Sequence, residues 1–407
     1  MQDHLVYWIW LQRAVGAGSA EVPCLLEAFK TAKAVWGADR FALERAGITN
    51  GKTLDMLCEK SLSGAQKQQE RCTKMGWMLT PQDALYPESL KSIFSPPLVL
   101  YGNGRLPSFE KTATPAIGIV GTRMCTRYGR ECAAAFAAGL SAAGCPIVSG
   151  GAKGIDRAAH EGALYAGGHT VIVQACGLNV EYPFANRDLR RQVLESGGAI
   201  LTEFAPATRA FSGNFHIRNR LISGLSKGVC VVEAPSASGA LITARTAREQ
   251  GRDVFVLPGR ATDKESRGSH TLIREGAILV DTPVQIIEEY SSYFGKKQET
   301  EAKQGFDAYY EWLESGGRTA ERVADSPIEL PGVEPEKGGT PAECPSYASE
   351  EVRRVYDALR THGPLMTEAI CEHCGLTPAE VFSVLTELEL YGCIENCAGK
   401  RYTIKTI

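Results

Sequence analysis

Three stretches of the chain place glycine, hydroxyl and arginine residues directly after short apolar runs. In GIVGTRMCTRYG, Gly121 lets a ligand approach the backbone, and Arg123 offers a planar fork of N–H donors. SGGAKGIDRAAH is a glycine-rich turn that opens a helix, where free N–H groups and the helix dipole attract anions. EAPSASGALITA repeats this arrangement with Ser238, Gly239 and Thr243. The ligand predicted for all three stretches is a phosphate group.

A fourth stretch, FSGNFHIRNRLISGLS, combines an aromatic ring with cations. Phe215 could stack on a nucleobase while Arg218, Asn219 and Arg220 reach phosphates, which is how proteins bind single-stranded nucleic acid. The residues alone equally allow Phe215 to be a core side chain with surface arginines around it. Neither reading is excluded by the sequence of this stretch.

The glycine-rich loops do not have the spacing of the common nucleotide-binding motifs. Neither matches G-x-G-x-x-G or G-x-x-x-x-G-K-[ST], so a dinucleotide or Walker-type triphosphate site is not indicated. The net charge of -3 gives no sign of a polyanionic partner, but the charge is uneven. Residues 205–275 hold eleven Lys and Arg against six Asp and Glu. This stretch is basic within an acidic protein.

These loops require a sheet that brings strand ends together. From residue 115, seven short apolar runs alternate with helical segments, namely AIGIV, PIVSG, TVIVQA, AILTE, VCVVEA, DVFVL and AILV. Continuous hydrophobicity in short runs is typical of parallel strands covered on both faces. The expected fold class is α/β, a Rossmann-like doubly wound and mostly parallel sheet. In such sheets ligands bind at the carboxyl ends of the strands.

Composition divides the 407 residues into four parts. Residues 1–80 are expected to form a small helical domain of the SAM or helix-hairpin-helix kind, and 81–290 the Rossmann-like domain. Residues 291–348 are rich in Lys, Glu, Pro and Gly and predict a flexible linker, with one short helix at FDAYYEWLESGG. Residues 349–407 predict three amphipathic helices and a hairpin, the winged-helix pattern.

The amino-terminal segment and the cysteines indicate a compartment. The opening MQDHLVYWIWLQRAVGAG has a six-residue apolar run and no basic residue before it, so neither a secretory signal nor a membrane span is expected. The expected location is the cytoplasm, where the thirteen cysteines would remain reduced and form no structural disulfide.

Nine motifs in order carry a resemblance to a known family. They are YPESL, PPLVLYGNG, IVGTRMCTRYG, IVSGGAKGIDRAAHEGAL, CGLNVEYP, FHIRNRLISGLS, EAPSASGALITA, VFVLPG and LIREGA. In sequence and spacing they resemble the DprA/Smf family, densely over residues 86–280 and more loosely in the flanking domains.

The resemblance implies a function and a set of residues. It implies a Rossmann-like domain that dimerises, binds and protects single-stranded DNA and loads the RecA recombinase onto it, as in natural transformation. It requires no cofactor and no catalysis. The DNA-binding residues expected on these grounds are Gly121, Thr122, Arg123, Ser149, Gly150, Gly151, Lys153, Gly154, Phe215, Arg218, Asn219, Arg220, Ser238, Gly239 and Thr243.

The chain departs from the family pattern at four positions. His216 stands where the family usually has Pro, and Ser212 stands where some members carry a basic residue, which implies weaker DNA binding. Ala175 replaces a glycine and His270 an asparagine, and neither change removes a phosphate donor.

Several carboxylates and one histidine are also compatible with catalysis or metal binding. A related superfamily binds or hydrolyses nucleotides, and Glu203 and Glu233 at strand ends are candidate acids or bases, although SASGALITA lacks the carboxylate such enzymes need. Asp156 and His160, four residues apart on a helix, could bind a metal, but a carboxylate in a first helical turn also favours the helix dipole.

The carboxyl-terminal domain raises two further alternatives. Its cysteines have spacings compatible with zinc, although a helix and a hairpin need not bring them together; they are Cys371, Cys374, Cys393 and Cys397. A winged helix could read duplex DNA, but the expected third helix carries Glu380, Glu387 and Glu389 and no cation, so it would repel phosphates. A protein-interaction module is therefore expected there.

Overall fold

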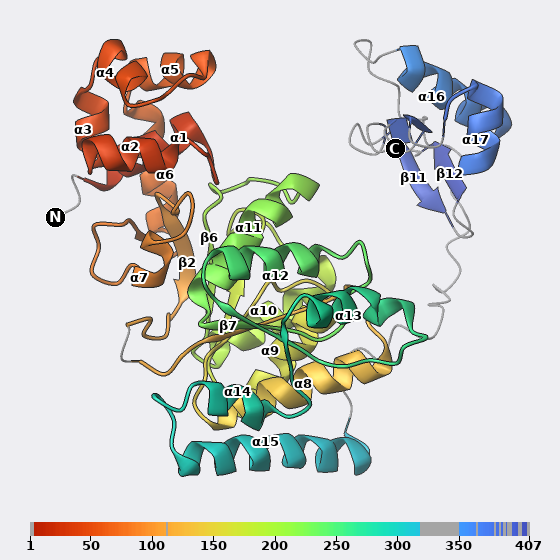
Figure 1. Ribbon diagram of the computed structural model, residues 1–407. Coiled ribbons are helices and arrows are strands. Elements are labelled where there is room, and N and C mark those ends of the chain that lie inside the picture. The colour runs from red at the N-terminus through yellow and green to blue at the C-terminus, as the bar shows by residue number, and fades with distance from the viewer. Residues whose placement is uncertain are drawn as a thin grey trace. The chain divides into compact units, whose positions relative to one another are not determined.

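The computed structural model describes residues 4–110, 113–317 and, with gaps, 350–404. The chain separates into two compact units, Met1–Arg322 and Val323–Ile407. The first unit holds the nine-stranded sheet and the amino-terminal helices (Figure 1). Among the described helices, none is long and apolar enough to cross a bilayer.

The central sheet has the strand order β1-β2-β6-β5-β4-β3-β7-β8-β9. Strands β3 to β9 are parallel and correspond to the seven apolar runs, so this expectation is confirmed. Their bounds are β3 Ile117–Val120, β4 Ile147–Ser149, β5 Thr170–Val173, β6 Ala199–Thr202, β7 Gly228–Val231, β8 Asp253–Val256 and β9 Ile278–Leu279. Two antiparallel strands, β1 (Trp77–Leu79) and β2 (Leu100–Gly104), extend the sheet beyond β6.

Helices cover both faces of this sheet. Ile117 and Ile119 of β3 lie in the core beneath α8, α9, α14 and α15, whereas Val120 lies in the core beneath α11 and α12. Burial on both faces explains why the strands are continuously apolar. The helices are α8 Arg127–Ala142, α9 Ile155–Tyr165, α10 Arg187–Glu195, α11 Ser212–Leu225, α12 Gly239–Glu249, α13 Arg267–Arg274, α14 Pro283–Glu289 and α15 Lys296–Glu314.

The amino-terminal helices share a core with one edge of the sheet. Leu98, Val99 and Tyr101, next to or within β2, are buried among their apolar side chains. Strand β1 already belongs to the large sheet, so the sheet begins at Trp77, shortly before the expected boundary at residue 80. The helices are α1 Leu5–Val15, α2 Val22–Phe29, α3 Ala32–Gly37, α4 Arg40–Arg45, α5 Gly51–Cys58 and α6 Ser63–Thr73, and the short α7 Glu88–Lys91 follows β1.

The segment expected to be a linker begins with a long helix instead. α15 starts at Lys296, well before the short helix predicted at residue 306, and packs on α8 with Ala302 and Tyr309 buried. The prediction was wrong for 296–314 because the average composition hides an apolar stripe at helical spacing, Ala302, Phe306, Tyr309 and Leu313. Residues 318–348 lie outside the described residues.

The second unit contains helices α16 (Glu350–His362) and α17 (Thr367–Cys374) and a small sheet with the order β10-β12-β11. The strands are β10 Leu365–Met366, β11 Ile394–Cys397 and β12 Arg401–Ile404. In the expected third helix, the carboxylate of Glu380 accepts a hydrogen bond from the backbone N–H of Thr377 at 2.8 Å. Glu387 and Glu389 lie outside the described residues.

Candidate nucleic-acid interface

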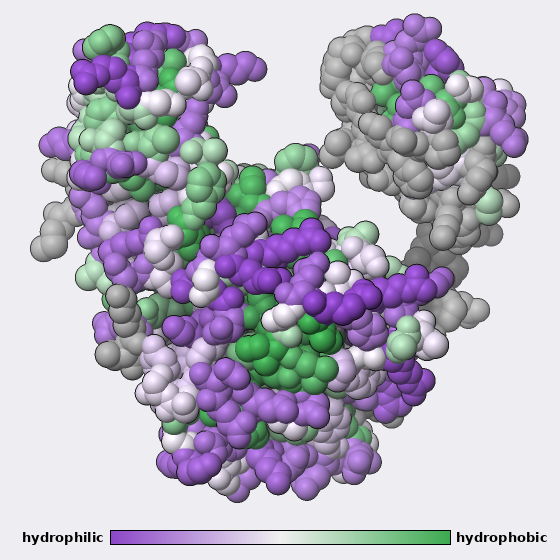
Figure 2. All heavy atoms as spheres, viewed as in Figure 1, coloured by the Kyte–Doolittle hydropathy of each residue, from purple (hydrophilic) through white to green (hydrophobic). Residues whose placement is uncertain are grey.

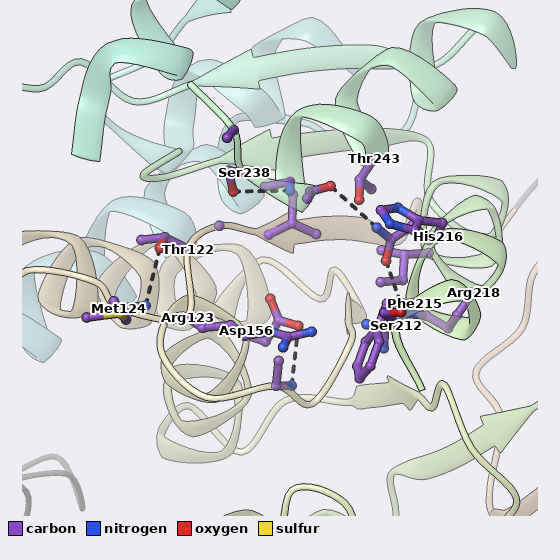
Figure 3. Close-up of a pocket in the computed structure, with 18 of the residues that line it drawn as sticks. Thr122, Arg123, Met124, Asp156, Ser212, Phe215, His216, Arg218, Ser238 and Thr243 are labelled. Atoms are coloured by element: carbon purple, nitrogen blue, oxygen red, sulfur yellow. Dashed lines mark hydrogen bonds between the residues drawn. The ribbon is translucent and has the colours of Figure 1, made fainter. Parts of the chain in front are cut away.

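A pocket of about 770 Å³ opens where the strand order reverses, between β3 and β7. In open α/β sheets this switch point is the usual ligand site, because the loops after the two strands diverge there. The loop after β3 supplies Thr122 and Arg123, and α11 supplies Phe215 and Arg218. The start of α12 closes a third side (Figure 3).

Phe215 is the aromatic centre of the pocket, and it is half-buried. The guanidinium of Arg123 lies over its ring, 4.4 Å from the centroid. The ring of Tyr182, from the loop after β5, lies 5.7 Å away at an interplanar angle of 59°. Both neighbours are exposed, so the guanidinium and the two rings form a cluster that solvent can reach. Such an arrangement can bind a nucleobase by stacking and a phosphate by charge.

Arg218 is buried in the wall of the pocket rather than reaching into solvent. Its guanidinium donates to the carbonyl oxygens of Gly150, at 2.7 Å, and Val173. Burial lowers the pKa of Arg218 to about 10, although the nearby Asp156 carboxyl opposes this shift. Burial likewise raises the pKa of Asp156, and Arg218 counteracts it. Arg218 therefore fixes the glycine-rich loop and adds a positive field to the pocket.

The hydroxyl groups expected to bind phosphate are engaged within the protein. Thr122 Oγ1 accepts from the Met124 N–H, Ser238 Oγ accepts from the Ala240 N–H, and Ser149 Oγ donates to the Ile119 carbonyl. Thr243 is buried, at 1% exposure. These side chains shape the loops that surround the pocket.

The structure brings nine of the fifteen expected residues together around the pocket. These are Gly121, Thr122, Arg123, Phe215, Arg218, Asn219, Ser238, Gly239 and Thr243. The others do not line it; they are Ser149, Gly150, Gly151, Lys153, Gly154 and Arg220. Ala152 is the residue of the glycine-rich loop that lines the pocket, and Lys153 is exposed outside it.

Arg220 differs most from its expected role as a phosphate ligand. Its guanidinium bonds to the Glu203 carboxylate at 2.5 Å, and both side chains are largely buried. Glu233 is engaged too, since it accepts hydrogen bonds from the N–H and the hydroxyl of Thr126 at the start of α8. Both candidate acids thus have structural partners.

The metal alternatives find little support in the described residues. His160 is buried, and its Nδ1 shares a hydrogen bond with Thr170 Oγ1 at 2.7 Å. No group of three or more metal-ligating side chains occurs within the part of the chain that the structure describes. Cys371, Cys374 and Cys393 take part in no disulfide, whereas the Cys397 side chain lies outside the described set. None of the eleven cysteines whose side chains the structure describes forms a disulfide.

Sequence reasoning missed three exposed apolar side chains at the pocket. Met124 is 86% exposed, Phe211 51% and Tyr182 41%, and all three line it. The motif EYPF, two aromatic residues around a proline after β5, was the available signal for Tyr182.

Comparison with protein families decides the relationship. The family model described as DNA recombination-mediator protein A matches residues 77–291, which is more than half of the chain. The chain belongs to the DprA/Smf family. The DprA winged helix domain matches residues 339–400, in agreement with the expected carboxyl-terminal domain.

Family relatives match over most of the chain. Protein Smf of Synechocystis is 32% identical over 97% of this chain and 98% of its own length. DprA of Streptococcus pneumoniae is 40% identical over 51% of this chain and 72% of its own length. The crystal structure of the pneumococcal protein superposes with a TM-score of 0.60 at 32% identity, covering 70% of this chain and 97% of that protein. The Rossmann-like fold expected from the sequence is thereby confirmed.

Proposed function

We propose that this DprA/Smf protein binds single-stranded DNA in the pocket between β3 and β7. The observation that carries the proposal is the cluster of Arg123, Phe215 and Tyr182 at the pocket, in which the guanidinium lies over the Phe215 ring. An aromatic platform beside a cation suits single strands of any sequence, because every base has a π face and every nucleotide a phosphate. Duplex DNA keeps its bases stacked internally and cannot use the platform.

We propose further that the protein acts as a recombination mediator, which protects single-stranded DNA and loads RecA onto it, as in natural transformation. The description of the matching family as a DNA recombination mediator supports this role. An assay for RecA assembly on strands covered by single-strand-binding protein tests it. The wild type should accelerate RecA assembly, and a Phe215→Ala variant should accelerate it less.

A homodimer through the Rossmann-like domain belongs to the same proposal. Strand β9 forms one edge of the nine-stranded sheet, and Leu279 in it is 48% exposed. Figure 2 shows apolar side chains at the surface between α13 and α14. Exposed sheet edges and apolar areas are common places of association. Analytical ultracentrifugation should find a dimer for the wild type and monomer for Leu279→Arg; equal masses would contradict this interface.

We propose that the pocket performs no catalysis. The strand-end carboxylates named as candidate acids or bases, Glu203 and Glu233, are hydrogen-bonded to Arg220 and Thr126 and do not line the pocket. Asp156 and Glu265 do line it, and Asp156 accepts a hydrogen bond from the Ala152 N–H. Release of base or phosphate from nucleotides incubated with the protein would favour the nucleotide-hydrolysing alternative instead.

Fluorescence anisotropy of a labelled oligo-dT, compared with a matched duplex at several salt concentrations, tests the DNA site. Phe215→Ala should weaken binding by about tenfold or more, since base stacking contributes roughly 1–3 kcal/mol. Arg123→Ala should also reduce the salt dependence by the contribution of about one phosphate contact. Lys227→Ala is the matched control, because Lys227 is an exposed cation just before β7 that does not line the pocket, and this variant should stay within about twofold of the wild type.

Equal affinity for single and double strands would contradict the proposed function. So would unchanged binding by both pocket variants.

A further inference from the structure

A buried chain of hydrogen bonds leads from the amino-terminal helices towards the sheet. Gln68 of α6 donates its Nε2–H to the Tyr101 hydroxyl at 2.8 Å, and that hydroxyl donates to Gln12 Oε1 of α1 at 2.8 Å. All three side chains are buried. The chain therefore joins two amino-terminal helices through one residue of the sheet edge.

The amide of Gln12 extends this chain to the end of β6. Its Nε2–H groups donate to the backbone carbonyl of Glu203 at 2.8 Å and to that of Val99 at 3.2 Å. The Glu203 carboxylate in turn bonds to Arg220 of α11. Helix α11 is the element that carries Phe215 and Arg218 into the pocket.

A second contact joins the same two regions. Burial raises the pKa of Glu203, and both Arg220 and the backbone N–H of Gly18, in the turn after α1, counteract this shift. A Cβ at Gly18 would stand 2.7 Å from Ile217 Cγ2 on α11, and its φ is +69°. Only glycine allows so close an approach in this conformation. The turn after α1 therefore packs closely on helix α11.

The two faces of α11 have different partners. Phe215, Arg218 and Asn219 line the pocket, whereas Ile217 and Arg220 meet the amino-terminal turn and Glu203. A helix moves as a unit, so a shift at one face displaces the side chains of the other. The contacts of Arg220 therefore influence the position of the Phe215 side chain in the pocket.

The buried Glu203–Arg220 ion pair has incomplete hydrogen bonding. Arg220 Nε and Nη1 and Glu203 Oε1 are buried without a hydrogen-bond partner among the described residues. Removing charges from water costs free energy that such a pair repays only with complete hydrogen bonding. A pair of this kind therefore restrains the positions of its two side chains more than it stabilises the folded state.

We propose that Gln12 and the Glu203–Arg220 pair are positioning residues, through which the amino-terminal helices hold α11 in the orientation that single-stranded DNA binding requires. The proposal rests on the DNA site proposed above and assigns Arg220 an indirect part in it. The amino-terminal helices become a component of the site.

Hydrogen–deuterium exchange on the full chain without DNA tests the positioning directly. Gln12→Leu keeps the side-chain volume and leaves the Tyr101 hydroxyl and the Glu203 carbonyl without their partner. Exchange in residues 212–225 should rise several-fold while α8, residues 127–142, keeps wild-type protection. Gln66→Leu makes the same chemical change at an exposed site of α6 and should alter neither segment. Unchanged exchange in 212–225 for Gln12→Leu would overturn the proposal, whether or not the protein binds DNA.

Oligo-dT binding at several salt concentrations separates positioning from direct contact. Arg220→Met should weaken binding by about tenfold with an unchanged salt slope, and Glu203→Leu with Arg220→Met should restore affinity to within about threefold, because both charges are then gone. A smaller salt slope without rescue by the double variant would mean that Arg220 contacts phosphate, and would overturn the assignment. Failure of the wild type to bind oligo-dT would contradict the proposed function, while the exchange experiment would still decide the positioning.

Discussion

The guanidinium of Arg218 and the carboxylate of Asp156 meet at Gly150, each within 2.6 Å of the point where a Cβ on that glycine would stand. Asp156 also accepts a hydrogen bond from the Ala152 N–H at 3.3 Å, so it holds the glycine-rich loop from the other side. The loop thus serves as the support of the pocket wall, and glycine is needed there for space.

Gly150→Ala should therefore destabilise the protein and weaken its DNA binding. The added methyl group must displace Arg218 or Asp156, and overpacking of this kind costs roughly 1–3 kcal/mol. Chemical denaturation measures the stability and anisotropy the binding. Gly37→Ala is the control, since a Cβ there meets nothing within 4 Å and the residue does not line the pocket; a similar loss in both variants would refute the steric explanation.

Tyr182→Ala should weaken oligo-dT binding by about fivefold or more, because the ring extends the stacking platform beside Phe215. Tyr182→Phe should retain most of the affinity, since stacking needs the ring and not the hydroxyl. Phe184→Ala is the matched control, because Phe184 is 70% exposed in the same loop but does not line the pocket. Equal effects of Tyr182→Ala and Phe184→Ala would argue against a specific role for Tyr182.

Ser212→Lys should strengthen binding. Ser212 is exposed and lines the pocket, three residues before Phe215. One added phosphate contact should steepen the slope of log K against log salt concentration by about 0.7 for single-stranded DNA. Ser292→Lys adds the same charge at an exposed site away from the pocket and controls for net charge. A gain of equal size in both variants would show only a general electrostatic effect.

His160 should make the protein sensitive to acid. Burial, together with the charge of Arg218, lowers its pKa from the ordinary 6.5 to about 3. The unfolded chain binds a proton below pH 6.5 that the folded protein excludes, so stability falls by about 1.4 kcal/mol per pH unit between these values.

Between pH 7 and pH 5, the free energy of unfolding of the His160→Gln variant should therefore fall by about 2 kcal/mol less than that of the wild type. Urea unfolding at both pH values measures the difference. His216→Gln, at an exposed histidine, controls for the substitution itself. Parallel pH profiles for the wild type and His160→Gln would refute the assignment to His160.

The local patterns of the chain were sufficient to predict the seven parallel strands and the loops that follow them. Continuous apolar runs such as TVIVQA and VCVVEA have few alternatives, because a doubly covered strand has no polar face. The same argument places Arg123 and Ser238 at one end of the sheet, since parallel strands share the edge where their loops begin. The helix over 296–314 was missed because average composition conceals periodic spacing.

The sequence by itself therefore determined the sheet, the end of it that holds the pocket, and the residue types gathered there. Only the tertiary structure decided which arginine lines the pocket. Arg218 and Arg220 stand two residues apart in one motif, yet Arg218 lines the pocket and Arg220 pairs with Glu203. The physical reason is that side chains two residues apart on a helix point in different directions. The residues that each of them contacts come from segments distant in the chain, so the sequence of the helix alone does not identify them.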